Sequence, residues 1–486
     1  MLDSTDDTVV DTVVDLPATI SSTTLEQPAA SVGSVYFIGM GGSGMRALAA
    51  VMAGRHWQVQ GSERCPVARR ELQNLGWTIA PDDDQQPVPR ACDLAIYSDA
   101  IPADHPQRIA AAQFKIPQQS YTQALGKMMS QHFRLAVAGT HGKSTVTMMA
   151  AQILRAADLD PTVVCGARPL EGSTIDKLTG GRPGVGKVFL AETCEYRRNF
   201  LQYHPHLAVV TSVELDHFET YQSTEQLAET FSQFVRQIDS RGRLIVYDDC
   251  RYVSRFRRAA HCEVETYGFS HHANWRATDL KSDAGCYEFT IKHGNRWIGR
   301  LALRVAGRHN VLNAVAAAAL AYRGGASPDD IIRSLAEFRG LGRRLQRLGE
   351  HAGVHVWDDF AHHPTAITAT LAALREVHPN SRLWCVFQPH QALRTRHLMD
   401  EFARSLQNAD VVAVAPVYRA REGEWQPGEP TAADLATVVR SFGTKTMICD
   451  TLDQIQQQLT CCPGDVLVTL GAGNISKISH DFANRI

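Results

Sequence analysis

The most informative stretch of this sequence reads Leu135-Ala136-Val137-Ala138-Gly139-Thr140-His141-Gly142-Lys143-Ser144-Thr145. Its first four residues form a short apolar run, which is typical of a buried β-strand. Glycines interrupt the run, and residues 145–156 then have the pattern of a helix. A strand that passes through a glycine turn into a helix is half of a parallel βα unit, so this stretch predicts an α/β fold.

The same alternation of strand and helix extends in both directions from this stretch. Further helices are predicted at residues 45–54 and 310–321. Residues 276–304 alternate polar and apolar side chains around a turn at 293–295, which predicts an antiparallel hairpin region inserted in the second domain. Apolar runs that are typical of buried strands occupy residues 35–38, 58–61, 94–97, 188–191, 208–211, 244–247, 354–358, 382–387, 411–415 and 466–470.

The length of 486 residues predicts about three domains, because domains usually contain about 150 residues. Glycines and arginines at residues 340–344 indicate a boundary there, and a second boundary is expected near residue 127. We therefore expect a Rossmann-like domain at residues 33–127, a central P-loop domain at 128–342 and a second Rossmann-like domain at 343–486. Residues 1–32 are acidic and contain no Lys or Arg, so they are predicted to be a disordered tail.

The composition limits the classes of partner. A net charge of -2 offers no overall attraction to nucleic acid or to an anionic membrane. The eleven cysteines include no C-x-x-C pair, and no run reaches about 18 apolar residues. The N-terminal segment has neither the basic start nor the apolar run of a signal peptide. The sequence therefore predicts a cytoplasmic protein with reduced thiols.

The glycine turn after residue 138 has the spacing Gly139-x-x-Gly142-Lys143-Ser144, a shorter variant of the phosphate-binding P-loop. Backbone N–H groups from Gly139 to Lys143 would surround the β- and γ-phosphates of a nucleotide. Lys143 would neutralise their charge, and the Ser144 hydroxyl would bind Mg²⁺. The alternative is a tight turn without a ligand, but the flanking strand and helix favour the P-loop.

An earlier glycine turn, Gly39-x-Gly41-x-x-Gly44, also follows a strand and opens a helix. Glu63 ends the next strand, which is the arrangement of dinucleotide-binding folds. The turn itself selects a diphosphate, so a nucleotide-sugar diphosphate fits as well as NAD or FAD. A tight turn with no ligand is the remaining alternative.

Two further polar side chains follow predicted strands that come after the P-loop in the sequence. Glu192 ends the strand at 188–191, and His217 lies just after the strand at 208–211. The carboxyl ends of parallel strands share one edge of a sheet, so both side chains are expected beside the P-loop. A carboxylate suits Mg²⁺, whereas a single histidine is less usual for it, so a structural role for His217 stays open.

Two asparagines near residue 310 indicate contacts with the adenine base of a nucleotide. Asn310 and Asn313 share one face at the start of a predicted helix, where side-chain amides would reach an adenine edge. The alternative for Asn310 is a helix N-cap.

The third domain contributes two polar runs, each of which follows a predicted strand. The adjacent His362 and His363 in the first run lack a third ligand at metal spacing, so the sequence predicts no zinc site. The second run is followed by Arg394 and Arg396. The two runs are Asp358-Asp359-Phe360-Ala361-His362-His363-Pro364 and Phe387-Gln388-Pro389-His390.

In their order along the chain, these motifs resemble the Mur ligase family from Ser34 onward. Six ordered motifs across three domains make a chance similarity negligible. They are Gly39-Met40-Gly41-Gly42-Ser43-Gly44-Met45, Gly139-Thr140-His141-Gly142-Lys143-Ser144-Thr145, Glu214-Leu215-Asp216-His217, His309-Asn310-Val311-Leu312-Asn313, Asp358-Asp359-Phe360-Ala361-His362-His363-Pro364-Thr365 and Phe387-Gln388-Pro389-His390.

The resemblance implies a set of site residues. The UDP-sugar would contact Gly41, Gly42, Ser43, Gly44 and Ser98. ATP would be held by Gly139, Thr140, His141, Gly142, Lys143, Ser144 and Thr145, its adenine by Asn310 and Asn313, its ribose by Asp359, and its phosphates also by Arg343 or Arg344. Mg²⁺ would bind Ser144, Glu192 and His217, and the amino-acid carboxylate would lie near His390 and Arg394. The residues expected to act in catalysis are Lys143, Glu192, His217, His390 and Arg394.

Departures from the family pattern occur at three places. After Glu192 the family usually reads Ala-Asp-Glu-Ser-Asp, whereas this chain reads Thr193-Cys194-Glu195-Tyr196-Arg197. Gln391 stands where an arginine is usual, so carboxylate recognition would depend more on Arg394. No lysine lies between His217 and Lys281, so the modified lysine of some related ligases is absent.

The resemblance implies ATP-dependent ligation of L-alanine to the lactyl carboxylate of UDP-N-acetylmuramate through an acyl phosphate. It implies ATP and Mg²⁺ as cofactors and a monomer or homodimer. The alternative within the family is a ligase that adds a recycled tripeptide to the same sugar. Outside the family, the alternatives are an NAD-dependent oxidoreductase built on Gly39 to Gly44 and an ATP-switched binding module.

Overall fold

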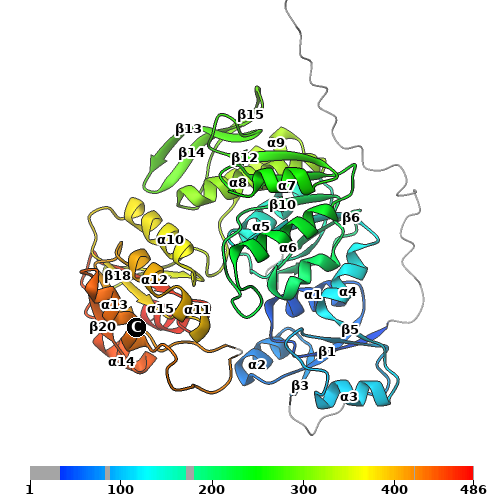
Figure 1. The fold of residues 1–486 in the computed structure, drawn as a ribbon, viewed down its shortest axis with the longest axis horizontal. Helices are drawn as coiled ribbons and strands as arrows, with labels where there is room; N and C mark the ends of the chain where they lie inside the picture. The colour runs from blue at the N-terminus through cyan, green and yellow to red at the C-terminus, as the bar shows by residue number, and fades with distance from the viewer. Residues whose placement is uncertain (1–32, 83–87, 171–179, 421, 485–486) are drawn as a thin grey trace, which may run out of the picture.

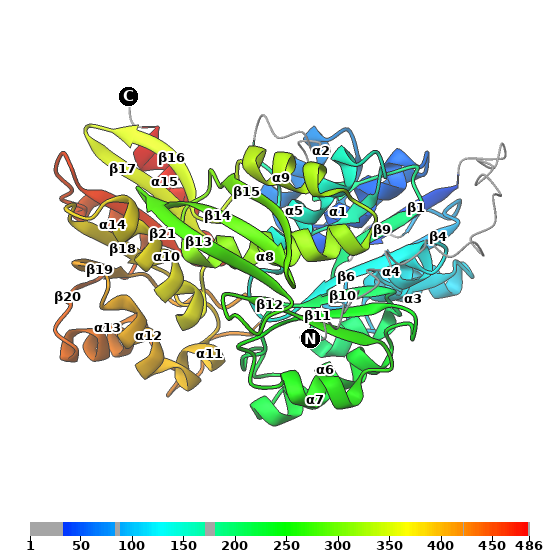
Figure 2. The ribbon, with the colours of Figure 1, turned by 90° about the horizontal axis from the view of Figure 1, so that it is seen from above.

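The computed structural model describes residues 33–82, 88–170, 180–420 and 422–484. The tail predicted at residues 1–32 lies outside the described residues. Three β-sheets divide the described chain, and Figures 1 and 2 both show the C-terminal sheet to one side of the central one. No described helix is long and apolar enough to cross a membrane. The predicted α/β class with three sheet-containing units is confirmed.

The N-terminal sheet is parallel and has the strand order β3-β2-β1-β4-β5. The strands predicted at 35–38, 58–61 and 94–97 are confirmed, whereas β3 and β5 were not predicted because both are short and partly polar. The bounds are β1 Ser34–Ile38, α1 Ser43–Gly54, β2 Gln58–Glu63, α2 Pro66–Asn74, β3 Thr78–Pro81, β4 Leu94–Tyr97, α3 Pro106–Gln113, β5 Gln118–Ser120 and α4 Tyr121–Met129.

The central sheet has the strand order β15-β14-β13-β12-β11-β10-β6-β9-β7-β8. Its parallel strands are covered on one face by α5 and α8 (Figure 2). The bounds are β6 Phe133–Ala138, α5 Lys143–Ala156, β7 Thr162–Val164, β8 Gly181–Arg182, β9 Val188–Glu192, the 3₁₀ helix η1 Tyr196–Gln202, β10 Leu207–Val210, α6 Thr224–Arg236, β11 Arg243–Tyr247, α7 Val253–Ala259, β12 Glu263–Gly268, β13 Trp275–Asp283, β14 Cys286–His293, β15 Arg296–Ala302, α8 Arg308–Arg323 and α9 Pro328–Glu337.

The antiparallel region predicted at residues 276–304 is confirmed, but it is larger than one hairpin. It contains β13, β14 and β15, with a second turn at Ala284 and Gly285, where both residues have positive φ. The three strands continue the central sheet, because β13 pairs in parallel with β12.

The C-terminal sheet has the order β16-β17-β21-β18-β19-β20 and is parallel except at β16. All four predicted strands of this unit are confirmed. The bounds are β16 Gln346–His351, β17 Val354–Asp359, α10 Pro364–Val377, β18 Leu383–Phe387, α11 Ala392–His397, α12 Met399–Leu406, β19 Val411–Val414, α13 Ala432–Ser441, β20 Lys445–Ile448, α14 Leu452–Gln458, β21 Val466–Leu470 and α15 Ser476–Ala483.

The order of the central strands places the predicted site residues together. Strand β6 lies between β10 and β9, and all three run in parallel. The P-loop follows β6, Glu192 ends β9, and residues 211–217 follow β10, so all lie at one sheet edge. We propose the domain borders predicted from the sequence, one within α4 near residue 127 and one between α9 and β16 near residue 342.

Candidate active site

The P-loop turn needs glycine at two positions. Gly139 has φ +128°, and a Cβ there would lie 2.1 Å from Thr211 Oγ1. Gly142, the N-cap of α5, has φ +77°, and a Cβ there would lie 2.5 Å from Asn313 Oδ1. Both positions combine a left-handed backbone with no room for a side chain, which explains the glycine spacing of the motif.

The backbone N–H groups of the turn are partly occupied by the protein itself. Thr140 N–H donates to the carbonyl of Ser212 at 2.9 Å, and His141 N–H donates to the Ser212 hydroxyl at 3.0 Å. In this conformation these two N–H groups are therefore engaged within the protein, and their contact with phosphate stays a prediction. The first turn of α5 has N–H groups without intrahelical partners, which favours phosphate binding at this helix start.

Lys143 is held at the helix start by a buried acid. Its Nζ lies 3.1 Å from Glu195 Oε2 and also donates to the carbonyls of Gly139 and Thr140. Burial by itself lowers the pKa of Lys143, but Glu195, Cys194 and Glu192 together outweigh burial, and the net pKa is raised. The lysine therefore stays positively charged, as binding of a phosphate requires. Sequence reasoning did not select Glu195, although it lies in the stretch that departs from the family pattern.

Ser144 and Glu192 form a pair of oxygen ligands. The Ser144 hydroxyl lies 3.0 Å from both carboxylate oxygens of Glu192, and Gly166 N–H fixes the carboxylate at 2.7 Å. A hydroxyl and a carboxylate on one edge suit Mg²⁺, which prefers oxygen. Arg344 Nη2 lies 3.3 Å from the same Ser144 hydroxyl.

The two predicted phosphate arginines behave differently. Arg344 faces the P-loop, whereas Arg343 donates to the carbonyl of Gly471 and lies 3.5 Å from Asp358. Arg343 therefore contacts groups within the C-terminal domain, and Arg344 is the arginine that faces Ser144.

A cavity of about 600 Å³ lies between the central and C-terminal domains. Gly139 and Arg343 are not among the described residues that line it. The predicted residues that do are Thr140, His141, Gly142, Lys143, Ser144, Thr145, Glu192, His217, Asn310, Asn313, Arg344, Asp359, His390 and Arg394.

The predicted base and ribose contacts lie in this cavity. The amide of Asn310 donates to the carbonyl of Ala306, and the amide of Asn313 donates to Asn310 Oδ1 at 3.0 Å. The N-cap of α8 is Gly307, so the N-cap alternative for Asn310 is wrong. Asp359 accepts from two backbone N–H groups, yet burial raises its pKa to about 6.

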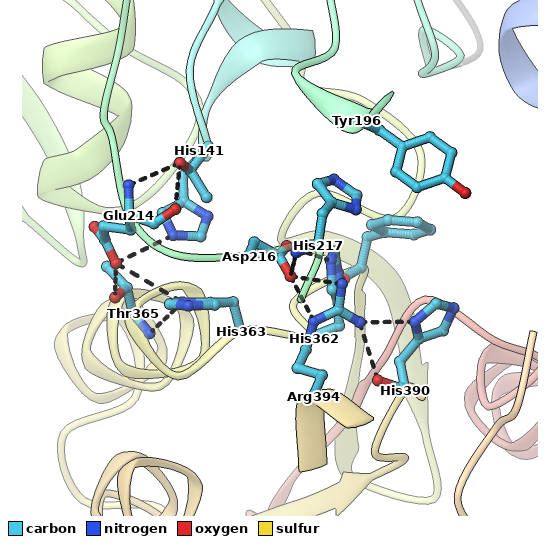
Figure 3. A network of polar contacts seen from close by, with 12 residues as sticks. His141, Tyr196, Glu214, Asp216, His217, His362, His363, Thr365, His390 and Arg394 are labelled. Atoms are coloured by element: carbon cyan, nitrogen blue, oxygen red, sulfur yellow. Dashed lines mark hydrogen bonds and ion pairs between the residues drawn. The ribbon is translucent and has the colours of Figure 1, made fainter. Parts of the chain in front are cut away.

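His217 lies across the cavity beside the ring of Tyr196 (Figure 3). It also contacts Cys194 and Glu219. Its φ is +55°, an uncommon conformation for a non-glycine residue. Burial lowers the pKa of His217, but Cys194 and Glu219 raise it well above its ordinary value. A protonated imidazole has no free lone pair, so a metal-binding role for His217 requires loss of that proton.

The C-terminal domain reaches the site through Arg394. Its guanidinium binds Asp216 Oδ1 at 2.7 and 2.8 Å and also contacts His390 Nδ1 at 2.8 Å (Figure 3). Arg394 holds the pKa of Asp216 far below its usual range, in spite of burial. The role predicted for Arg394 near an amino-acid carboxylate stays a prediction, because in this conformation Asp216 occupies the guanidinium.

A second cavity of about 270 Å³ lies at the first glycine turn. It is lined by Gly42, Ser43, Gly44 and Ser98, as predicted for the UDP-sugar. It also contains Lys143 and Glu192, which line the larger cavity too, so the two cavities meet there.

Gly41 departs from this arrangement. It does not line the cavity, and its N–H donates to Glu63 Oε2 at 2.6 Å. Glu63 also accepts from Cys65 N–H at 2.9 Å. The acid that would bind the ribose of a dinucleotide is therefore used within the turn, which disfavours the NAD alternative.

Comparison with known proteins agrees with the resemblance. Residues 34–133 match the Mur ligase family catalytic domain, residues 137–321 the Mur ligase middle domain, and residues 343–473 the Mur ligase glutamate ligase domain. The chain is 34% identical to a UDP-N-acetylmuramate–L-alanine ligase of Acetivibrio thermocellus, over 92% of this chain and 95% of the relative. It is 35% identical to the enzyme of the same name from Desulfitobacterium hafniense, over 92% and 99%.

Solved structures show the same architecture. A UDP-N-acetylmuramate–alanine ligase of Thermotoga maritima matches with a TM-score of 0.78 and 25% identity, over 93% of this chain and 98% of that one. A murein peptide ligase of Psychrobacter arcticus matches in fold, with a TM-score of 0.69 and 24% identity, over 93% and 99%. With matches to all three domains and relatives that align along most of its length, the chain belongs to the Mur ligase family.

Proposed function

We propose that this protein is an ATP-dependent ligase that joins L-alanine to the lactyl carboxylate of UDP-N-acetylmuramate. The observation that carries the proposal is the meeting of two cavities at Lys143 and Glu192. A sugar diphosphate in the smaller cavity would present its acid to a nucleotide in the larger one. The names of the relatives supply the identity of the two substrates.

The residues divide into groups by the ligand that they would hold. Gly42, Ser43, Gly44 and Ser98 would contact the UDP-sugar. The start of α5, Lys143 and Arg344 would bind the phosphates of ATP, and Asn310, Asn313 and Asp359 would bind its nucleoside. Ser144 and Glu192, with His217, would hold Mg²⁺, which supplies neutralisation of phosphate charge when bound.

The chemistry proceeds in two steps. A carboxylate is a poor acyl donor, so the γ-phosphoryl group of ATP passes to the lactyl carboxylate and gives an acyl phosphate and ADP. The neutral amine of L-alanine then attacks the acyl carbon, and phosphate leaves with the former carboxylate oxygen. Phosphoryl transfer needs alignment and charge neutralisation, which Lys143 and closure of the C-terminal domain would provide.

Product analysis tests the substrates. Purified protein is incubated with UDP-N-acetylmuramate, ATP, Mg²⁺ and a mixture of amino acids, and the products are identified by mass spectrometry. We expect a product heavier by one alanyl residue and ADP in equal amount. Release of ADP with a tripeptide but not with L-alanine would favour the recycling ligase instead.

A variant tests the P-loop. Lys143→Ala is expected to lower product formation by at least about 10³-fold, because the charge on the transferred group is no longer neutralised. Lys445→Ala, at an exposed position on edge strand β20, is the matched control and should retain full activity. Full activity of Lys143→Ala would refute the assignment of Lys143 to the phosphate site.

A cytoplasmic location and a monomeric or homodimeric state remain part of the proposal.

A further inference from the structure

Three potential metal ligands converge where the P-loop meets the C-terminal domain. His141 belongs to the P-loop, Glu214 follows β10, and His363 is the N-cap of α10. Their ligand atoms all lie within 4.8 Å of one another. His141 Nε2 is 3.4 Å from Glu214 Oε2, and His363 Nδ1 is 3.8 Å from the same oxygen (Figure 3).

Hydrogen bonds within the protein satisfy this group poorly. His141 Nε2 is buried and makes no hydrogen bond, although the Glu214 carboxylate lies nearby. His363 Nδ1 accepts only a long bond of 3.4 Å from Thr365 N–H. The Thr365 hydroxyl also donates to Glu214 Oε2. A buried imidazole nitrogen that faces a carboxylate at 3.4 Å, in a geometry that does not make a hydrogen bond, is the observation that points to a missing ligand.

We propose that His141, Glu214 and His363 form a binding site for one zinc-class transition-metal ion. Two imidazoles and one carboxylate are an established zinc ligand set, with the fourth position open to water or substrate. Metal–ligand bonds of about 2.0–2.2 Å in a tetrahedron place ligand atoms about 3.3–3.6 Å apart. The separations of 3.4 and 3.8 Å from Glu214 Oε2 are close to these values. The two imidazole nitrogens lie within 4.8 Å of each other, so they would have to approach by up to about 1.5 Å.

The ligand types separate this site from the magnesium site. Mg²⁺ prefers oxygen ligands, as Ser144 and Glu192 offer, whereas imidazole nitrogen favours zinc and its neighbours in the transition series.

Occupation of the site would join two domains. His141 and Glu214 belong to the central domain, whereas His363 belongs to the C-terminal domain. An ion that needs all three ligands binds the closed arrangement better than an open one, so it shifts the equilibrium towards closure. Exchange of products requires opening, so the ion is expected to slow turnover.

Metal binding is tested on the complete, metal-free chain in excess Mg²⁺ and without nucleotide. Co²⁺ absorption reports the geometry of the ligands, and calorimetry with Zn²⁺ reports affinity and stoichiometry. We expect one ion per chain and the intense visible bands of four-coordinate Co²⁺. His363→Asn, which keeps an N-cap oxygen, should weaken binding by at least about tenfold. The absence of saturable Zn²⁺ binding would overturn the proposal.

A neighbouring histidine provides the matched control. His362 precedes His363 but faces Asp216, at 3.9 Å from Oδ2, and not Glu214. His362→Gln should bind Zn²⁺ as the unaltered chain does, and Glu214→Gln should bind it weakly. Thermal denaturation checks that each variant is folded. Equal Zn²⁺ affinity of His363→Asn and the unaltered chain would then refute the site.

The effect on turnover is measured separately. Zn²⁺ should inhibit the unaltered enzyme in excess Mg²⁺, and His363→Asn should show inhibition only at concentrations at least about tenfold higher. Equal inhibition of both proteins would place the inhibitory ion elsewhere and overturn the effect on closure. The binding measurements do not depend on the proposed reaction, so failure of that reaction would leave them intact.

Discussion

The two borders of the central domain are built differently. At the border with the N-terminal domain, side chains from both domains belong to one hydrophobic core, for example Leu48 and Leu125 with Phe200 and Phe234. Helix α4 packs on η1, and α1 packs on β7 and β8. The N-terminal and central domains therefore share apolar burial that excludes water.

At the border with the C-terminal domain, the described contacts near the cavity are polar or aromatic. Arg394 binds Asp216, Thr365 donates to Glu214, and the rings of Phe218 and His397 stack with centroids 4.6 Å apart. These groups can be hydrated when the domains separate, whereas exposure of a shared apolar core is costly. From this comparison we expect the first border to keep the two cavities in register and the second border to be the one that opens.

The largest expected effect tests the apolar border. Phe200→Ala removes a fully buried ring that stacks on Phe234, and should cost about 3–5 kcal/mol. Because the core is shared, the N-terminal and central domains should unfold together at a lower temperature in calorimetry. Phe402→Ala, an equally buried ring of the C-terminal core, is the control and should shift only the transition of that domain. Separate transitions of the first two domains would break the comparison.

An effect of similar size tests the ion pair at the polar border. Arg394→Ala leaves Asp216 buried without its partner, which usually costs about 3–5 kcal/mol. Opening of the border rehydrates Asp216. The lost free energy should therefore appear as separation of the central and C-terminal domains rather than as unfolding. We expect a larger radius of gyration in X-ray scattering and activity lowered by about 10²-fold.

Arg396, on the same helix α11, supplies the control for this variant. Its guanidinium donates to the carbonyl of Gly428 on the exposed side. Arg396→Ala should leave the radius of gyration unchanged. An unaltered radius for Arg394→Ala as well would show that other contacts hold the border closed.

The polar border should also weaken with acid. The pKa of His363 is about 4 in the structure and 6.5 ordinarily, and that of Glu214 is about 2 against 4.5. Both pKa values are lower in the closed structure than in the open state. The open state therefore binds more protons as the pH falls. Closure should weaken from pH 6.5 to 4 through His363 and from pH 4.5 to 2 through Glu214.

Scattering with a chelator present, from pH 7.5 to 4, measures the first phase. His363→Asn should remove it, because no group at that position then titrates. Closure that strengthens as the pH falls would contradict the assignment.

The smallest effect concerns the aromatic stack at the polar border. The rings of Phe218 and His397 are parallel, with an interplanar angle of 1°. Phe218→Ala should cost about 0.5–1.5 kcal/mol of closure and reduce activity less than about tenfold. Phe218→Leu restores part of the apolar contact. Its activity in steady-state kinetics should lie between those of Phe218→Ala and the unaltered enzyme. A loss as large as that of Arg394→Ala would show that stacking, not the ion pair, dominates this border.

Local patterns explain what the sequence predicted well. The strand before Gly139, the helix after Lys143 and the position of Glu192 at a strand end all depend on neighbours within a few residues. Apolar runs and glycine positions record such short-range requirements directly. The short polar strand β5 and the second turn at Ala284 and Gly285 were missed, because the tertiary packing around them compensates for weak local signals.

Contacts between distant residues could not be predicted in this way. The motif around Glu214 contains Asp216, yet nothing in its spacing indicates that Arg394 binds that acid. Likewise, adjacent Arg343 and Arg344 are equivalent in the sequence, and only their surroundings direct one to Gly471 and the other to Ser144.

By itself, the sequence determined the α/β class, the P-loop and the strand ends that carry Glu192 and His217, because these follow from periodicity and backbone requirements. Only the tertiary structure decided which partner each charged group has. It paired Lys143 with Glu195 and brought His363 to His141. The physical reason is that such distances depend on how the sheets and domains pack, and residues far apart in the chain carry no local record of that packing.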